Sequence, residues 1–371
     1  MGEERGLAMI RGRIERAQQV MTRQGVDYLF VTPSPDLVYL LDYPAHASER
    51  MTLLAVPSSG QPLILVPELE APRLEDKRPV LTVHPWGETE QPAALAANLL
   101  PHLNGATIAI SDVTWAVFLL RLMQAMPGAR FVPGDTVLRE LRMVKDAQEL
   151  EYLRIAAQRT DQVWQATLDR VPFAGQSETM VAARMTELMA EFGLDGPEFL
   201  IVASGPNSAS PHHITGDRVI QPGDAVVIDF GGRYHHYVSD LTRTVHVGEP
   251  SDEFRRVYET VLRANEAAFE ATRPGAECQA VDRAARAVIA GAGYGDYFIH
   301  RVGHGIGVDV HEEPYMVEGN TQKLAPGMVY TDEPGIYLPG RFGVRIEDAV
   351  VVTEQGAEKY SHVSRALTVV T

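Results

Sequence analysis

Five side chains of the kind that bind metals lie in the second half of the chain, each within or beside an apolar, strand-like run. The imidazole is that of His304, inside the glycine-rich stretch Gly-His-Gly-Ile-Gly at residues 303–307. Glycine inside a strand-like run usually marks a close approach of the backbone to a ligand. The four carboxylates are Asp229, Asp240, Glu333 and Glu347. Together these side chains predict a site for hard metal ions, assembled from the second half of the chain.

The spacing of the acidic residues supports this prediction. Asp240 follows Asp229 by eleven residues, across a turn rich in Gly, Arg and His. A hairpin there would put two carboxylates side by side, which is costly unless a cation lies between them. Arg345 and Glu347 are two residues apart in an expected strand over residues 345–352, so both should point to one face. Four carboxylates and one imidazole suffice for two divalent cations, and they suit Mn, Co or Zn. Such a pair activates water and polarises a carbonyl oxygen.

The order of expected helices and strands divides the chain into two parts. The first alternates helices and strands, which is typical of an α/β domain. Its strands are expected at residues 26–32, 52–56, 62–66 and 107–111, and its helices up to Gly25 and at 92–103 and 115–126. The second part has longer helices, expected at residues 147–170, 178–191, 253–272 and 279–292. Its strands are expected at 199–203, 225–229, 238–246, 308–310, 327–331 and 345–352. We therefore expect two domains, residues 1–140 and 141–371.

The composition excludes several classes of function. The net charge of −16 argues against binding to nucleic acid or to an anionic membrane surface. No segment approaches the roughly 18 uninterrupted apolar residues of a membrane span, and the charged N-terminus does not resemble a secretory signal. The single cysteine, Cys278, cannot form an intrachain disulfide. These features indicate a cytoplasmic protein and leave a small-molecule or peptide substrate open.

The five residues, in this order and with their neighbours, resemble the metal ligands of the pita-bread metallopeptidases. That family includes methionine aminopeptidase, aminopeptidase P and prolidase. The resemblance rests on the words Asp-Phe-Gly-Gly at 229–232, Ser-Asp-Leu-Thr-Arg-Thr at 239–244, Gly-His-Gly-Ile-Gly at 303–307 and Glu-Pro-Gly-Ile-Tyr at 333–337. It covers roughly residues 150–371, and the preceding part resembles the creatinase-type domain of aminopeptidase P and prolidase. The resemblance implies an α/β creatinase-like N-terminal domain, an α+β pita-bread catalytic domain and a homodimer.

The resemblance also implies a role for each matching residue. The five expected ligands of two divalent metal ions, with Mn favoured over Co or Zn, are Asp229, Asp240, His304, Glu333 and Glu347. Glu333 would also act as general acid and base. His212 and His311 would be catalytic, the first at the substrate or its developing oxyanion and the second at the substrate amide. His300 and Arg345 would bind substrate, Arg345 by anchoring a carboxylate or by orienting Glu347.

The implied reaction is hydrolysis of the bond between an N-terminal residue and proline in a small peptide. The short chain favours prolidase, and aminopeptidase P acting on longer peptides is the alternative. Tyr315 stands where many prolidases have an arginine for the dipeptide carboxylate, which favours the alternative or transfers that role to Arg345 or another residue. His236 stands where the family more often has glycine. Methionine aminopeptidase, a metal-free creatinase-like hydrolase and a non-catalytic peptide-binding module are remoter alternatives.

Overall fold

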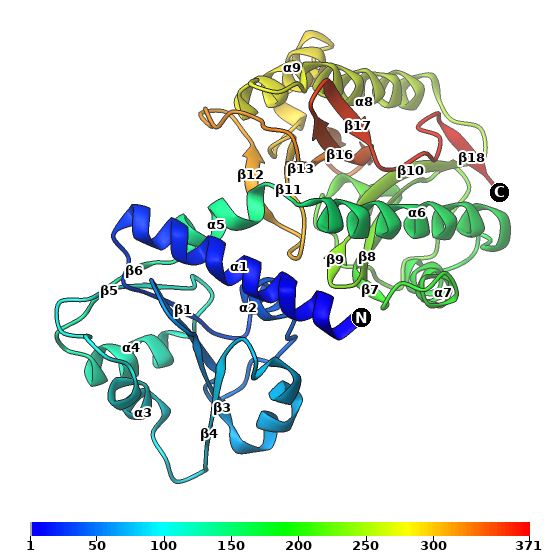
Figure 1. Ribbon diagram of the computed structural model, residues 1–371. Helices are drawn as coiled ribbons and strands as arrows, with labels where there is room; N and C mark the ends of the chain where they lie inside the picture. Colours follow the sequence, from blue (N-terminus) through cyan, green and yellow to red (C-terminus); the bar gives the residue numbers. More distant parts are fainter. Residues whose placement is uncertain (1) are drawn as a thin grey trace. The chain divides into compact units, whose positions relative to one another are not determined.

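The computed structural model describes residues 2–371, whose contacts divide into two compact units, Met1–Arg142 and Met143–Thr371 (Figure 1). The first unit contains a six-stranded sheet in the order β4-β3-β2-β1-β5-β6. Its strands are β1 (Tyr28–Val31), β2 (Leu53–Pro57), β3 (Leu63–Pro67), β4 (Thr82–Trp86), β5 (Thr107–Ile110) and β6 (Arg130–Pro133). Strand β2 is antiparallel to both its neighbours, whereas β1, β5 and β6 are parallel to one another.

Helices cover both faces of this sheet (Figure 1). They are α1 (Gly2–Gln24), α2 (Pro35–Leu41), the 3₁₀ segment η1 (Glu68–Lys77), α3 (Pro92–Leu99), α4 (Ala116–Ala125) and α5 (Asp135–Met143). Ser34 caps the N-terminus of helix α2, and its side chain accepts a hydrogen bond from the amide of Leu37. Phe30 of β1 shares one apolar core with Ala96 of α3 and Leu122 of α4. The expected α/β unit is therefore built around a mixed sheet.

The second unit is organised around a sheet in the order β12-β11-β13-β16-β10-β8-β7. Its strands are β7 (Pro197–Ser204), β8 (Ala225–Tyr234), β10 (Leu241–Val247), β11 (Gly303–Gly305), β12 (Glu312–Met316), β13 (Val329–Asp332) and β16 (Glu347–Thr353). Neighbouring strands along this path are antiparallel. The short strands β9 (Tyr237–Val238), β17 (Gly356–Lys359) and β18 (Thr368–Val370) pair with β8, β16 and β10, and β14 (Gly335–Leu338) pairs with β15 (Phe342–Arg345).

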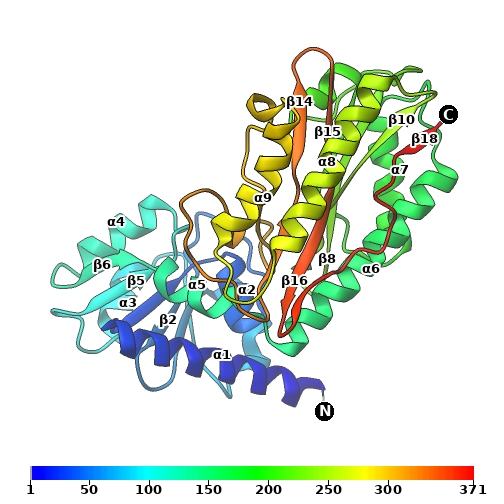
Figure 2. The ribbon, with the colours of Figure 1, turned by 90° about the horizontal axis from the view of Figure 1, so that it is seen from above.

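Two helix pairs cover this sheet, α6 (Ala147–Arg170) with α7 (Glu178–Glu191) and α8 (Asp252–Ala271) with α9 (Cys278–Gly291) (Figure 2). The 3₁₀ segments η2 (Gly205–Ala209) and η3 (Gly295–Tyr297) are short connections. Helix α6 begins with a capping box, in which Asp146 and Glu149 bind each other's backbone amides. The first helix pair shares a core with β8 and β10, and the second with β13 and β16. Within residues 2–371, no helix is long and apolar enough to cross a membrane.

The structure corrects two expected strands near the predicted site. Residues 308–310 form a loop, and strands lie on either side of it as β11 and β12. Strand β11 forms at the glycines because its backbone packs too closely for a side chain: a Cβ on Gly303 would lie 1.5 Å from the carbonyl oxygen of Thr331. The expected strand over residues 345–352 is interrupted, since β15 ends at Arg345 and β16 begins at Glu347.

Candidate metal centre and active site

Five adjacent strands each bring one expected metal ligand to the same cavity. Asp229 lies within β8, Asp240 directly precedes β10, His304 is the middle residue of β11, Glu333 directly follows β13, and Glu347 opens β16. In the sheet these strands are contiguous, in the order β11-β13-β16-β10-β8. All five side chains line one cavity of about 740 Å³. The juxtaposition follows from strand pairing, because residues far apart in sequence become neighbours across the ladder.

Strand alternation explains why these polar side chains point into the cavity. Ile228 and Phe230, on either side of Asp229, belong to the apolar core shared with α6 and α7. Successive side chains of a strand point to opposite faces, so Asp229 points away from the helices. The same alternation puts Asp348, next to Glu347, on the helix-covered side, where its carboxylate pairs with the guanidinium of Arg243 at 2.6 Å.

The donor atoms of three expected ligands lie within 4.8 Å of one another, those of Asp240, His304 and Glu347. Nε2 of His304 is 3.8 Å from Oδ2 of Asp240 and 3.3 Å from Oε1 of Glu333. Asp229 lies outside the tightest group, and its Oδ2 accepts a hydrogen bond from Arg345 at 2.6 Å. The structure thus brings all five residues to one cavity and packs three of them most closely.

The electrostatics of these carboxylates fit a bound cation. Burial raises the pKa values of Asp240 and Glu347 well above their usual range, and the negative charges of neighbouring carboxylates raise them further. Burial also raises the pKa of Glu333 to about 7, with the charge of Asp229 adding to the effect. Oδ1 of Asp229 and Oδ1 of Asp240 are buried and have no hydrogen-bond partner among the residues described. A divalent cation would bind these oxygens and relieve the repulsion, so the residues fit a metal centre.

The hydrogen bonds of His304 prepare one ring nitrogen for a ligand role. Its Nδ1 lies 3.1 Å from the carbonyl oxygen of Gly305, to which it donates as N–H. This contact leaves the lone pair of Nε2 directed at Asp240 and Glu333. Burial lowers the pKa of His304 well below its ordinary value, so the ring is neutral near pH 7.

Three further expected histidines lie at the same cavity. The ring of His311 meets the ring of His304 edge-on, with their centroids 4.0 Å apart. Burial, followed by the charge of Arg301, lowers the pKa of His311. His212 is exposed at the cavity wall. Burial, followed by the charge of Arg345, lowers the pKa of His300 to about 4. The rings of His311 and His300 are therefore suited to donate or accept hydrogen bonds while uncharged.

Sequence reasoning missed Tyr337, which joins two of the expected residues. Its hydroxyl lies 2.9 Å from Nε2 of His300 and accepts a hydrogen bond from Arg345 at 2.9 Å. Nδ1 of His300 donates to the carbonyl oxygen of Arg301 at 2.7 Å, so Nε2 accepts a hydrogen bond from the tyrosine. The chain of contacts continues from Arg345 to Asp229. Tyr337 is the last residue of the motif Glu-Pro-Gly-Ile-Tyr, so the sequence pointed to it. Its hydrogen-bond partners, however, depend on the fold.

The turn between Asp229 and Asp240 also has a structural explanation. Strands β8 and β9 form a hairpin whose two central residues are His235 and His236, with φ values of 47° and 70°. Both lie in the left-handed region that favours glycine, which is the residue more often found at position 236 in the family. His236 therefore carries backbone strain, and it does not line the metal-site cavity.

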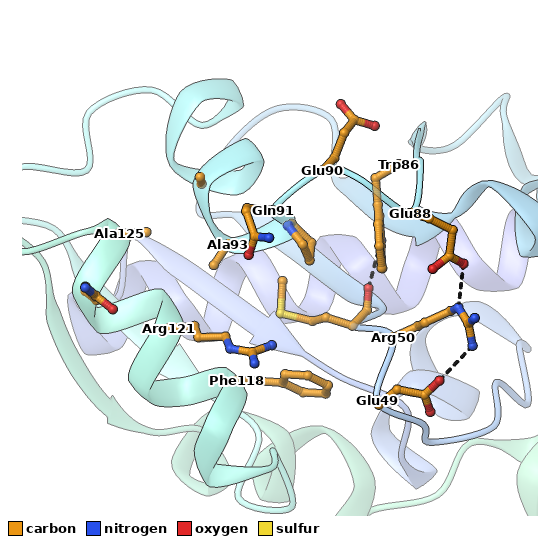
Figure 3. Close-up of a pocket in the computed structure, with 14 residues that line it drawn as sticks. Glu49, Arg50, Trp86, Glu88, Glu90, Gln91, Ala93, Phe118, Arg121 and Ala125 are labelled. Atoms are coloured by element: carbon orange, nitrogen blue, oxygen red, sulfur yellow. Dashed lines mark hydrogen bonds and ion pairs between the residues drawn. The ribbon is translucent and has the colours of Figure 1, made fainter.

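A second cavity, of about 500 Å³, lies in the first unit and differs in chemistry (Figure 3). Trp86 and Phe118 form apolar parts of its wall. Arg50 pairs there with Glu49 at 2.7 Å and with Glu88 at 2.8 Å. Among the residues that line it and that the structure describes, none is a histidine, cysteine or aspartate. The carboxylates among its described lining residues are Glu49, Glu88 and Glu90, so the cavity of the second unit differs in combining carboxylates with histidines.

Comparison with known proteins agrees with this geometry. The model of metallopeptidase family M24 matches residues 151–354, which is more than half of the chain. The chain belongs to family M24. The model of the creatinase/prolidase N-terminal domain matches residues 13–144 of this M24 protein. The resemblance inferred from sequence is confirmed, as is the architecture of a creatinase-like α/β domain followed by an α+β pita-bread domain. The protein is a metallopeptidase, and its family implies a divalent metal.

Relatives of this M24 peptidase match over nearly its whole length. It is 42% identical over 362 residues to the probable dipeptidase PepE of Mycobacterium bovis, covering 96% of each chain. It is 35% identical over 358 residues to the Xaa-Pro dipeptidase of Pyrococcus furiosus, covering 96% of this chain and 99% of the relative. The crystal structure of the prolidase from Thermococcus sibiricus superimposes with a TM-score of 0.93 at 37% identity, covering 96% of this chain and 98% of that one.

Proposed function

We propose that this M24 peptidase hydrolyses the bond between an N-terminal residue and proline, with Xaa-Pro dipeptides as its preferred substrates. The observation that carries the proposal is the convergence of five metal-type side chains and three histidines on one cavity. The names of the relatives, dipeptidase and Xaa-Pro dipeptidase, support the substrate class. Aminopeptidase P activity on longer peptides remains the alternative.

We propose that two divalent metal ions are held by five ligands: Asp229, Asp240, His304, Glu333 and Glu347. Carboxylate and imidazole donors suit Mn, which we favour, as well as Co and Zn. When bound, such ions supply an activated water and polarise the substrate carbonyl. The unpartnered buried oxygens of Asp229 and Asp240 support this assignment.

The protein's own groups complete the reaction. Glu333, whose pKa is raised to about 7, takes a proton from the attacking water and transfers it to the imide nitrogen of proline. His212 and His311, which face the cavity, donate hydrogen bonds to the oxyanion and to the substrate amide. The resemblance implies that His300 and Arg345 bind substrate; we propose that they act instead through their chain of hydrogen bonds, which fixes the orientation of Asp229.

A hydrolysis panel tests the proposal. The protein is stripped of metal, Mn²⁺ is restored, and Ala-Pro, Ala-Pro-Ala and Met-Ala-Ser are offered. Cleavage of Ala-Pro alone is the expected result, whereas cleavage of the tripeptide Ala-Pro-Ala would identify an aminopeptidase P. Asp240→Ala should lower kcat/KM by more than about 100-fold, and Asp296→Ala, which alters an exposed aspartate, should not. Cleavage of Met-Ala-Ser alone, no activity, or full activity of Asp240→Ala would refute the Xaa-Pro mechanism.

We also propose that the enzyme is a cytoplasmic homodimer whose domains comprise residues 1–140 and 141–371. The change of contacts after Arg142 supports the domain boundary. The family resemblance supports the dimer, which light scattering in solution would test. The lone cysteine, Cys278, is buried and free, and such cysteine usage is typical of a reducing compartment.

A further inference from the structure

The substrate proposed above ends in a carboxylate, and the cavity must recognise that charge. Two cationic side chains line the cavity, Arg301 and Arg345. Tyr315, at the position where many prolidases have an arginine, brings no charge. The two arginines are therefore the candidates that we compare for binding the carboxylate of a dipeptide.

The guanidinium of Arg345 is already hydrogen-bonded within the protein. Its side chain is 3% exposed and donates hydrogen bonds from all three nitrogens. Nε binds Thr242, one terminal nitrogen binds Tyr337 and the carbonyl oxygen of Pro211, and the other binds Asp229 at 2.6 Å. Turning this guanidinium toward a substrate would break its ion pair with an expected metal ligand. Arg345 is therefore a poor candidate for the carboxylate.

Arg301 has the opposite properties. Within residues 2–371, its guanidinium has no hydrogen-bond or ion-pair partner, and its Cζ atom lies 4.1 Å from the centroid of the Tyr315 ring. A guanidinium that stacks on a ring uses its flat face, and its N–H groups, which lie in the plane, stay free to bind a carboxylate. The backbone of Tyr315 is held in place, because its amide donates to the carboxylate of Glu313 at 3.1 Å and its carbonyl oxygen accepts from Asn320 at 2.7 Å.

The position of Arg301 also fits a dipeptide. It lies three residues before His304 in sequence and lines the same cavity. It lines this cavity together with His304, His311 and Glu333, which are groups of the expected reaction centre. In an Xaa-Pro dipeptide, the terminal carboxylate is only two bonds from the imide nitrogen that is released. A cation near these groups is therefore within reach of that carboxylate.

We propose that Arg301, supported on the ring of Tyr315, binds the proline carboxylate of a dipeptide and so makes the enzyme prefer dipeptides. This inference rests on the proposed Xaa-Pro function and names its specificity determinant. The contact is a charge-assisted, bidentate pair, for which the planar guanidinium is suited. A tripeptide lacks a carboxylate at this place and gains nothing from the contact.

The test compares Ala-Pro with Ala-Pro-amide, which differ only in the charge of the C-terminus. The wild-type enzyme should prefer Ala-Pro. Arg301→Gln should lower kcat/KM on Ala-Pro on the order of 10- to 100-fold, mainly through KM, and leave the amide unchanged. Tyr315→Phe keeps the ring and should keep the preference, whereas Tyr315→Leu should weaken it. Arg283→Gln, which removes an exposed arginine of α9, is the charge-matched control. Thermal melting and Mn²⁺ binding check that each variant is folded.

The outcomes separate this inference from the proposed function. Cleavage of Ala-Pro by the wild-type enzyme tests the proposed function, and the ratio of kcat/KM on Ala-Pro to kcat/KM on Ala-Pro-amide tests the role of Arg301. Equal losses on both peptides in Arg301→Gln, or no loss on either, would overturn the assignment while the Xaa-Pro function stands. A wild-type enzyme that shows no preference for Ala-Pro over Ala-Pro-amide would also overturn the assignment of Arg301. A wild-type enzyme that cleaves neither peptide would refute both.

Discussion

The half-buried histidine His300 should make the folded protein sensitive to mild acid. Burial and the charge of Arg345 lower its pKa from 6.5 to about 4, so the folded state resists protonation of this ring. In the unfolded chain the ring regains its ordinary pKa and binds a proton between pH 6.5 and 4. Stability contributed by neutral His300 is therefore present above pH 6.5 and is lost as the pH falls toward 4.

The size of the effect follows from the two pKa values. The loss approaches about 3 kcal/mol below both values and amounts to about 2 kcal/mol between pH 7 and pH 5. The assay is urea unfolding of the metal-free protein at a series of pH values. Replacing Trp86 and Trp115 by phenylalanine leaves Trp164, a buried residue of α6, as the reporter of the second unit. A change of about 2 kcal/mol would shift the midpoint by roughly 0.7 M urea.

Comparison of wild type with His300→Gln tests whether His300 causes this pH dependence. The acidic ligands titrate in both proteins, so their contribution cancels in the difference. His300→Gln should be less stable than wild type at pH 7. Between pH 7 and pH 5 its free energy of unfolding should fall by about 2 kcal/mol less than that of wild type. His362→Gln, which removes an exposed histidine, controls for the loss of one imidazole. Equal slopes for wild type and His300→Gln would refute the reasoning.

Two further predictions concern the support of the site. Lys145 and Glu312 form an ion pair at 2.7 Å, with side chains 1% and 7% exposed. Lys145→Met should lower the free energy of unfolding by about 3–5 kcal/mol, because it leaves the charge of Glu312 buried. The double variant with Glu312→Leu should recover most of this stability in thermal melts. A double variant as unstable as the single one would contradict this expectation. Gly303→Ala should lower the melting temperature by about 6–12 °C and impair Mn²⁺ binding, because its Cβ would lie 1.5 Å from a backbone oxygen. Gly291→Ala, where a Cβ meets nothing within 4 Å, should leave both unchanged, and an unaffected Gly303→Ala would refute the packing argument.

Signals carried by local sequence predicted much of the fold. Helices α6 and α7 have the predicted bounds, residues 147–170 and 178–191. Their N-terminal ends can be read from the sequence, because Asp146 and Ser177 are capping residues whose side chains accept hydrogen bonds from the first turn. The convergence of the expected ligands at one cavity was also predictable, because each lies in or beside an apolar run that reads as a strand.

Features that depend on tertiary packing were not predictable in this way. The alternation around Val308 and Val310 suggested a strand, but both residues lie in a loop. Strand β11 forms instead at glycines with low strand propensity, because the neighbouring backbone leaves no room for side chains. Strand β12 includes a proline, Pro314, which reads as a poor strand residue from sequence alone. In each case the contact with the next strand overrides the local preference.

The metal ligands and the proposed specificity residue differ in how sequence encodes them. A carboxylate in or beside a buried strand is conspicuous, because burying it is costly and demands a counter-charge. An arginine is common on any surface, and only its surroundings distinguish Arg301 from Arg345. The guanidinium of Arg345 has every nitrogen bound by the protein, whereas that of Arg301 contacts only an aromatic ring among the residues that the structure describes. Their roles follow from which N–H groups remain free, and that property exists only once the strands have paired.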